Sequence, residues 1–197
     1  MNIALIHLGN KGGTYHYSKS HIKYLNPKLI VCTRKFKKHF SYAYPNQSMM
    51  GLTTYSNFIE LLFSSLFTPI YLVYFIFKCI RLSINRVFIL DCHPWTFLFA
   101  FASRLLNLKV LVVVHDGVNA NKNRFGKLSQ LLQILLLFNS SHLFFLSNIV
   151  RKNTFASFPL LHKKESDVYP LPPTFLTKEF NNNSKSDIKK DQKKCSF

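Results

Sequence analysis

The chain has 197 residues, of which 48% are hydrophobic, so it is long and apolar enough to form one packed domain. It carries 26 Lys and Arg residues against 8 Asp and Glu residues, a formal charge of +18, which favours anionic partners such as nucleic acid, acidic lipids or phosphorylated metabolites. The four cysteines are scattered without a CxxC pair, which excludes a zinc-ligand pattern and a disulfide framework, so we expect free thiols and no metal or other cofactor.

The first part of the chain predicts a strand, a helix and a second strand. The apolar run "NIALIHL" (2–8) ends at a glycine and is typical of a buried strand, and the opening lacks the basic start of a signal peptide. Residues 14–25 have a helical period that ends before Pro27, and "KLIVCT" (28–33) predicts the second strand. The basic, aromatic stretch "RKFKKHFSYAYPNQ" that follows has no clear period.

A long helical region is predicted over 55–83. Its central part, "LLFSSLFTPIYLVYFIF" (61–77), has no charge and approaches the length that spans a bilayer. Ser64, Ser65, Thr68 and Pro69 interrupt it, and Glu60 and Lys78 bound it closely. We therefore expect a buried or membrane-facing helix here rather than a transmembrane helix.

The second part of the chain alternates strands with helices. We expect strands over 86–93, 109–116, 142–147 and 166–173, and helices over 95–107, 125–139 and 148–158. The strands are near-continuous apolar runs, which is typical of strands covered on both faces. The pattern predicts an α/β fold, a doubly wound, Rossmann-like parallel sheet over 1–176, and the polar composition of 177–197 predicts a linker or disordered tail.

The loop after the first strand, "HLGNKGGTY", contains the first candidate ligand contacts. In an open parallel sheet, ligands bind outside the carboxyl ends of the strands. Gly12 and Gly13 allow a ligand to approach the backbone just before a helix N-terminus, and Lys11 adds a cation. The loop matches neither GxGxxG nor the P-loop, so it is either a phosphate or sugar contact or a tight turn that requires glycine.

Two further strand ends carry polar side chains. Asp91 and His93 lie in "LDCHPW", and His93 is either a ligand contact or an orienting or packing residue. His115 and Asp116 directly follow the most apolar strand, and they either contact a sugar hydroxyl or phosphate or satisfy each other within the loop. Because parallel strands end at one edge of the sheet, we expect these loops to converge.

The order and spacing of several segments resemble a known family. They are "GNKGGTYHYSKSHIKYL", "DCHPW", "KVLVVVHDGV", "LFFLSNIVRKNTF" and "VYPLPPTF". Over residues 1–175 the chain resembles the N-terminal, acceptor-side domain of GT-B glycosyltransferases of the large retaining family that includes many bacterial polysaccharide and lipopolysaccharide enzymes.

The resemblance implies a function and roles for the candidate residues. It implies transfer of a sugar from a nucleotide-sugar donor to a glycan or lipid-linked acceptor in surface polysaccharide biosynthesis. Gly12 and Gly13 would face the donor phosphates and the acceptor, and His93 would be a further substrate contact. His115, with Asp116, would position the transferring sugar and act as the catalytic pair, mostly by electrostatics and positioning.

Such enzymes have a second Rossmann-like domain that holds the nucleotide. Because this chain ends at Phe197, where that domain would begin, we expect either a truncated or frameshifted product or a half-enzyme that needs a partner chain, inactive alone. A noncatalytic partner subunit and a basic nucleic-acid-binding protein are the alternatives, although no recognised nucleic-acid module is present.

The resemblance also implies a location in the cytoplasm, peripheral on the inner face of the cytoplasmic membrane. Members that modify lipid-linked acceptors dock through basic and aromatic surfaces, a composition found at 33–44 and in the 61–77 helix. These segments are either such a docking surface or a solvated loop beside a core helix.

Overall fold

The computed structural model describes residues 2–9, 13–53, 58–93, 95–115 and 126–168. The strands form a single sheet in the order β3-β2-β1-β4-β5-β6-β7, and every neighbouring pair is parallel. This is the doubly wound arrangement that the alternation of elements predicts, and it is confirmed. The strands are β1 (Ile3–His7), β2 (Leu29–Thr33), β3 (Ser48–Leu52), β4 (Arg86–Ile89), β5 (Lys109–Val114), β6 (His142–Phe145) and β7 (Glu165–Val168).

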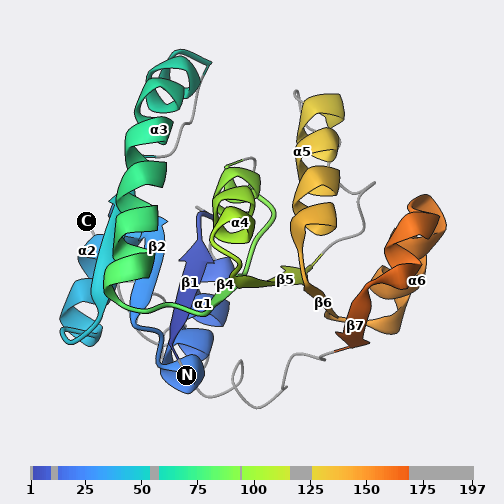
Figure 1. Cartoon of the computed structure of the whole chain (residues 1–197), viewed down its shortest axis with the longest axis horizontal. Helices are drawn as coiled ribbons and strands as arrows, with labels where there is room; N and C mark the ends of the chain where they lie inside the picture. Colours follow the sequence, from blue (N-terminus) through green and yellow to red (C-terminus); the bar gives the residue numbers. More distant parts are fainter. Residues whose placement is uncertain (1, 10–12, 54–57, 94, 116–125, 169–197) are drawn as a thin grey trace, which may run out of the picture.

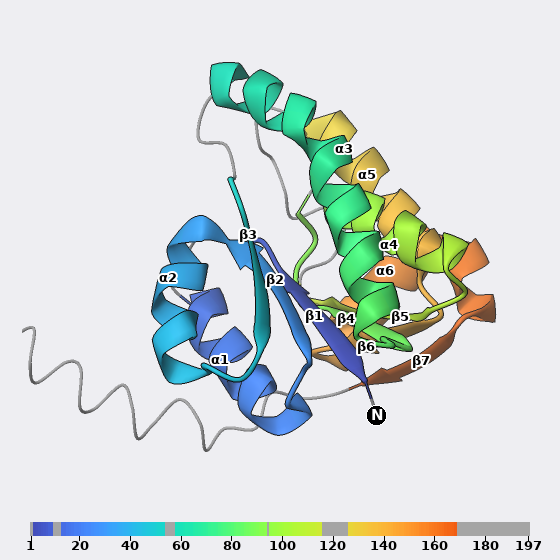
Figure 2. The ribbon, with the colours of Figure 1, turned by 60° about the vertical axis from the view of Figure 1, so that its left-hand side comes forward.

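Helices cover the sheet in two layers, which Figures 1 and 2 show from two sides. One layer holds α1 (Gly13–Leu25) and α2 (Arg34–Ala43), and the other holds α3 (Phe58–Arg81), α4 (Thr96–Leu105), α5 (Gly126–Asn139), α6 (Asn148–Ser157) and the 3-10 helix η1 (Pro159–Lys163). Alternate residues along the strands are buried in two separate hydrophobic cores, one on each face of the sheet. Leu5 and Ile30 pack towards α1 and α2, whereas Ala4 and Ile6 pack towards the other layer. Both faces of the central strands are therefore dry, which explains their continuous apolar sequence.

The stretch without a clear period (34–47) contains α2, and the edge strand β3 follows it. Thr33 caps α2, because its hydroxyl oxygen accepts a hydrogen bond from the Phe36 N–H at 3.3 Å. Phe36 and Phe40 are buried one turn apart, and the four cations of the helix are exposed. The sequence pattern alone does not predict α2, because its many charges conceal an apolar stripe of two residues. It does not predict β3 either, because that strand is short and contains Gly51. The predicted last strand is shorter than expected, since β7 ends at Val168 and residues 169–173 lie outside the described residues.

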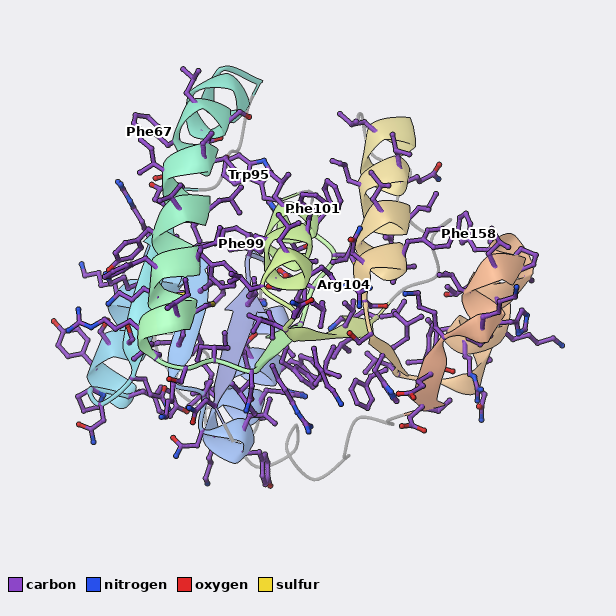
Figure 3. All side chains as sticks on the ribbon, viewed as in Figure 1. Phe67, Trp95, Phe99, Phe101, Arg104 and Phe158 are labelled. Atoms are coloured by element: carbon purple, nitrogen blue, oxygen red, sulfur yellow. The ribbon has the colours of Figure 1, made fainter. Side chains whose placement is uncertain are left out.

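Helix α3 is apolar on both its inner and its outer face. On the inner side, Phe75 is fully buried and meets Phe99 of α4 edge to face, with ring centroids 5.1 Å apart. Figure 3 shows Phe99 between α3 and α4 and Phe67 pointing away from α4. On the outer side, Leu66, Ile70 and Val73 are 71%, 63% and 68% exposed. Among the described residues, no helix has the length and apolar character needed to cross a membrane.

Candidate functional site

The candidate site lies where the sheet reverses its direction of growth. From β1 the chain builds β2 and β3 on one side, then returns to place β4 and β5 on the other side. In open α/β sheets, ligands generally bind at such a switch point, outside the carboxyl ends of the strands, which here are the ends of β1 and β4. His7 ends β1, Asp91 and His93 follow β4, and His115 follows β5 directly. Three adjacent strands therefore deliver three imidazoles and one carboxyl group to one edge.

Asp91 ties the end of β4 to the loop that leaves β1. Its Oδ2 atom accepts a hydrogen bond from the Leu8 N–H at 2.8 Å, and the Gly9 N–H is a further donor to the carboxyl group. Both N–H groups belong to the residues that open the loop towards α1, so Asp91 fixes where that loop starts. Burial raises the pKa of Asp91 from 3.8 to about 7, although the two N–H donors oppose the rise.

His7 is a buried imidazole beside this carboxyl group. Only 1% of its surface is exposed, and its ring meets the edge of Phe36 with ring centroids 5.1 Å apart. Its Nδ1 atom lies 3.6 Å from Asp91 Oδ2, and neither ring nitrogen has a hydrogen-bond partner among the described residues. Burial, together with the nearby His115 and His93, lowers the pKa of His7 to about 4, so the ring is neutral at neutral pH.

His115 and His93 lie at the same edge, as predicted. His115 Nε2 is 2.6 Å from the carbonyl oxygen of Leu90, so this nitrogen carries a proton and donates it. The His115 ring also meets the Tyr17 ring of α1, with centroids 4.7 Å apart. In His93 the Nδ1 atom accepts a hydrogen bond from the Trp95 N–H at 3.3 Å, and burial lowers the pKa of His93 to about 4. Both contacts fix the orientation of the rings.

The remaining sequence candidates are only partly placed. Gly13 is the first residue of α1, so the glycine loop does lead into a helix N-terminus. Lys11, Gly12 and Asp116 lie outside the described residues. Sequence reading missed His7 as a site residue, although a signal was present: His7 is the polar residue inside an otherwise apolar run at the end of the first strand.

The chemistry that this edge can perform is recognition by neutral hydrogen-bonding groups. Neutral imidazoles can donate to and accept from sugar hydroxyls without a strong charge, and a helix N-terminus attracts phosphate. Among the described residues, no group of three or more His, Cys, Asp or Glu side chains has an arrangement that could hold a metal ion.

No protein-family model matches the chain, and no curated protein sequence matches it. Solved structures do share its fold. UDP-N-acetylglucosamine 2-epimerase from Rickettsia bellii superposes with a TM-score of 0.66 at 9% identity, over 98% of this chain and 51% of that one. The UDP-GlcNAc 2-epimerase from Neisseria meningitidis bound to UDP-GlcNAc gives 0.64 at 11% identity, over 98% and 52%. Anabaena Alr3699/HepE in complex with UDP-glucose gives 0.61 at 10% identity, over 93% and 50%.

These similarities show the fold of the chain, a Rossmann-like domain of the GT-B type. The chain spans about half the length of each of these structures. The neighbours are enzymes of nucleotide sugars, and they include epimerases as well as glycosyltransferases, so they do not single out the retaining polysaccharide and lipopolysaccharide family.

Proposed function

We propose that the chain forms the acceptor-side wall of a glycosyltransferase cleft. In this reaction the bond between the sugar carbon and the donor phosphate breaks and an acceptor hydroxyl oxygen bonds to that carbon. The nucleoside diphosphate departs, and the hydroxyl proton passes to a base or to the solvent. The observation that carries the proposal is the meeting of His7, Asp91, His93 and His115 at the switch point of the sheet. The neutral ring of His93 suits a sugar hydroxyl, and the start of α1 suits a phosphate.

The proposal assigns separate tasks to the groups at this edge. His115, with Asp116, positions the transferring sugar, and His93 contacts a sugar hydroxyl. Lys11, Gly12 and Gly13 face the phosphates of a nucleotide-sugar donor, whose nucleotide is held by a second domain or by a partner chain. The acceptor is a glycan or a lipid-linked sugar of surface polysaccharide biosynthesis.

Binding of donor fragments tests the location of the cleft. We expect UDP-glucose and UDP-GlcNAc, titrated into the full chain, to shift the amide resonances of Leu8, Gly9 and Asp91. The variant His115→Ala should weaken this response, whereas His39→Ala, which removes an exposed histidine of α2, should leave it unchanged. Shifts that avoid this edge, or that survive His115→Ala at full strength, would contradict the assignment.

Turnover tests whether the chain works alone. We expect no transfer by the isolated chain, because in this proposal the chain contacts only the sugar and the phosphates of the donor, and a second domain or chain holds the nucleotide. Transfer by the chain alone would refute the need for a second domain or chain, and interconversion of UDP-GlcNAc with its 2-epimer would replace transfer by epimerisation. Copurification with a nucleotide-sugar-binding chain, without any sugar binding at His115, would support a noncatalytic partner subunit.

We also propose that the domain works at an anionic membrane surface, peripherally on the cytoplasmic face. The outer face of α3 presents uncharged apolar side chains over four turns, among them Leu66, Ile70 and Val73, and Lys78 and Arg81 follow at its C-terminal end. Among the side chains that the structure describes, the exposed carboxylates are those of Glu165 and Asp167, far along the sheet on β7. An apolar face bordered by cations complements anionic lipids.

The structure separates the two segments that the sequence suggested for this docking. The basic helix α2 lies in one layer and α3 in the other. We expect the full chain to bind vesicles that contain an anionic lipid, and to lose most of that binding when the salt rises from about 0.1 M to about 0.5 M. Replacing Ile70 and Val73 by serine should abolish binding, whereas replacing Lys35 and Lys38 of α2 by glutamine should weaken it only slightly. Equal binding to neutral vesicles would contradict the proposal, as would a stable dimer that the serine variant disrupts.

A further inference from the structure

A hollow lies at the amino-terminal ends of the strands, whereas the candidate site lies at their carboxyl ends. Its volume is about 850 Å³, and it is formed where β4, β5 and β6 begin. A hollow of this size is in the range that accommodates a small organic ligand. Five cations line it, from the strands, from α4 and from the end of η1: Arg86, Arg104, Lys109, Lys163 and Lys164. Figure 3 shows Arg104 at the end of α4 that is nearest to β5.

The charges of this hollow are poorly balanced. One carboxylate lines it, that of Glu165, and its Oε2 atom lies 3.5 Å from His142 Nδ1. Asp167 is engaged by the same imidazole, at 3.0 Å from Nε2. Among the described residues, no carboxylate lies within ion-pair distance of Arg86, Arg104, Lys109 or Lys163. Within the described part of the chain, four cations of the hollow therefore have no acidic partner.

The ends of the neighbouring helices do not account for these cations. Helices α4 and α5 end beside the hollow, and a cation there could simply offset the partial negative charge of their last carbonyl groups. Lys164 does so for the end of α5, donating to the carbonyl oxygens of Phe138 at 2.8 Å and Ser140 at 2.5 Å. The end of α4 is closed by its own backbone, because the Leu108 N–H donates to the Ser103 carbonyl at 2.9 Å.

The cations also lie close enough to repel one another. Burial and the charge of Arg104 both lower the pKa of Lys164. Such crowding of like charges is unfavourable, and a multivalent anion placed among the cations would relieve it.

The floor of the hollow suits an organic body rather than a bare ion. Leu111 and Phe144 line it, and the Phe144 ring packs on His142 with centroids 4.6 Å apart. The Ser141 hydroxyl oxygen accepts a hydrogen bond from the Val110 N–H at 3.2 Å, so its own proton remains to be donated to an acceptor. Cations, a hydroxyl donor and an aromatic surface together match a phosphate group attached to a planar or apolar moiety.

We propose that this hollow is a second ligand site, which binds a phosphate-bearing organic anion at the amino-terminal ends of the strands, opposite the sugar cleft. The phosphates lie among Arg86, Arg104 and Lys109, and the organic moiety lies on Phe144 and Leu111. The site shares no residue with the proposed cleft, so it stands whether or not the chain transfers sugars.

Titration of the full chain with defined anions tests the proposal. We expect pyrophosphate and ADP to bind, ADP more tightly because of its base, and adenosine not to bind. The double variant Arg104→Gln with Lys109→Gln should lose at least about tenfold in affinity for both anions, as is usual when charged hydrogen-bond donors are removed. A matched control, Lys35→Gln with Lys38→Gln on α2, removes the same charge from an exposed surface and should change the affinity less than about twofold.

Three outcomes would contradict the proposal. Equal losses in both double variants would mean that net charge alone attracts the anions. Binding of pyrophosphate without preference for ADP would remove the organic part of the assignment. Amide shifts at Val110, Ser141 and His142 should accompany binding in the unmodified chain, and their absence would overturn the location. UDP-sugar binding at the carboxyl ends of the strands is measured in a separate titration. The absence of binding at one of the two sites is therefore recognised independently of the other site.

Discussion

Replacement of Asp91 by asparagine should change how the stability of the protein depends on pH. Asparagine keeps an oxygen that accepts the N–H groups of Leu8 and Gly9, but it cannot ionise. The pKa of Asp91 is raised by burial from 3.8 to about 7, so between these values the unfolded chain is ionised at this residue and the folded protein is not. The unfolded state then binds fewer protons, and the free energy of unfolding falls as the pH rises.

The size of the effect follows from the shift in pKa. About three pKa units at about 1.4 kcal/mol each correspond to about 4 kcal/mol. We therefore expect the stability of Asp91→Asn relative to the unmodified protein to improve by about 4 kcal/mol between pH 4 and pH 8. Taking the difference between the two proteins cancels the titration of the other groups. Urea unfolding at several pH values, with a common slope, measures it.

A second variant separates ionisation from hydrogen bonding. Asp91→Ala removes the acceptor of two backbone N–H groups and should be less stable than Asp91→Asn by about 2 kcal/mol or more at every pH. A difference between Asp91→Asn and the unmodified protein that stays constant within about 1 kcal/mol from pH 4 to pH 8 would refute the reasoning, because it would mean that Asp91 ionises in the folded protein as it does in water.

Three further changes have expected outcomes that urea unfolding can check. Phe99→Ala empties a fully buried site against Phe75 and should lower the free energy of unfolding by about 3–5 kcal/mol. Phe101→Ala, on the exposed side of the same helix, should lower it by less than about 1 kcal/mol. Similar losses in the two variants would contradict the burial of Phe99 against Phe75. Thr33→Ala removes the N-cap hydrogen bond of α2 and should lower the free energy of unfolding by about 1 kcal/mol. Thr33→Ser keeps a hydroxyl acceptor and should retain most of that stability. An equal loss in both variants would argue against the capping role of Thr33. The pKa of His93 is lowered to about 4, so the stability that this residue contributes is present above pH 6.5 and is lost towards pH 4. His93→Gln should therefore remove about 2–3 kcal/mol of the loss in unfolding free energy on acidification. If the dependence of the unfolding free energy on pH is unchanged in this variant, the ring is accessible to protons in the folded protein.

Much of the architecture could be predicted from the sequence, because apolar runs and helical periods are local properties. The runs at 2–8, 28–33 and 109–116 predict buried parallel strands, and the structure confirms them as β1, β2 and β5. The convergence of His93 and His115 also follows from the sequence, since the carboxyl ends of parallel strands share one edge. By contrast, α2 and β3 have patterns too short or too charged to be read without the sheet that they complete.

The sequence by itself determined which polar side chains follow which strands, because chain order and strand direction fix that much. Only the tertiary structure decided their chemical state. Leu8 and Asp91, 83 positions apart, are joined by a hydrogen bond, and His7 is enclosed by segments as distant as Phe36 and His115. Burial, pKa and exposure depend on neighbours brought together by folding. The lowered pKa values of His7 and His93 and the cationic hollow therefore leave no local signal in the chain, whereas the uncharged apolar run of α3 can be read directly from the sequence.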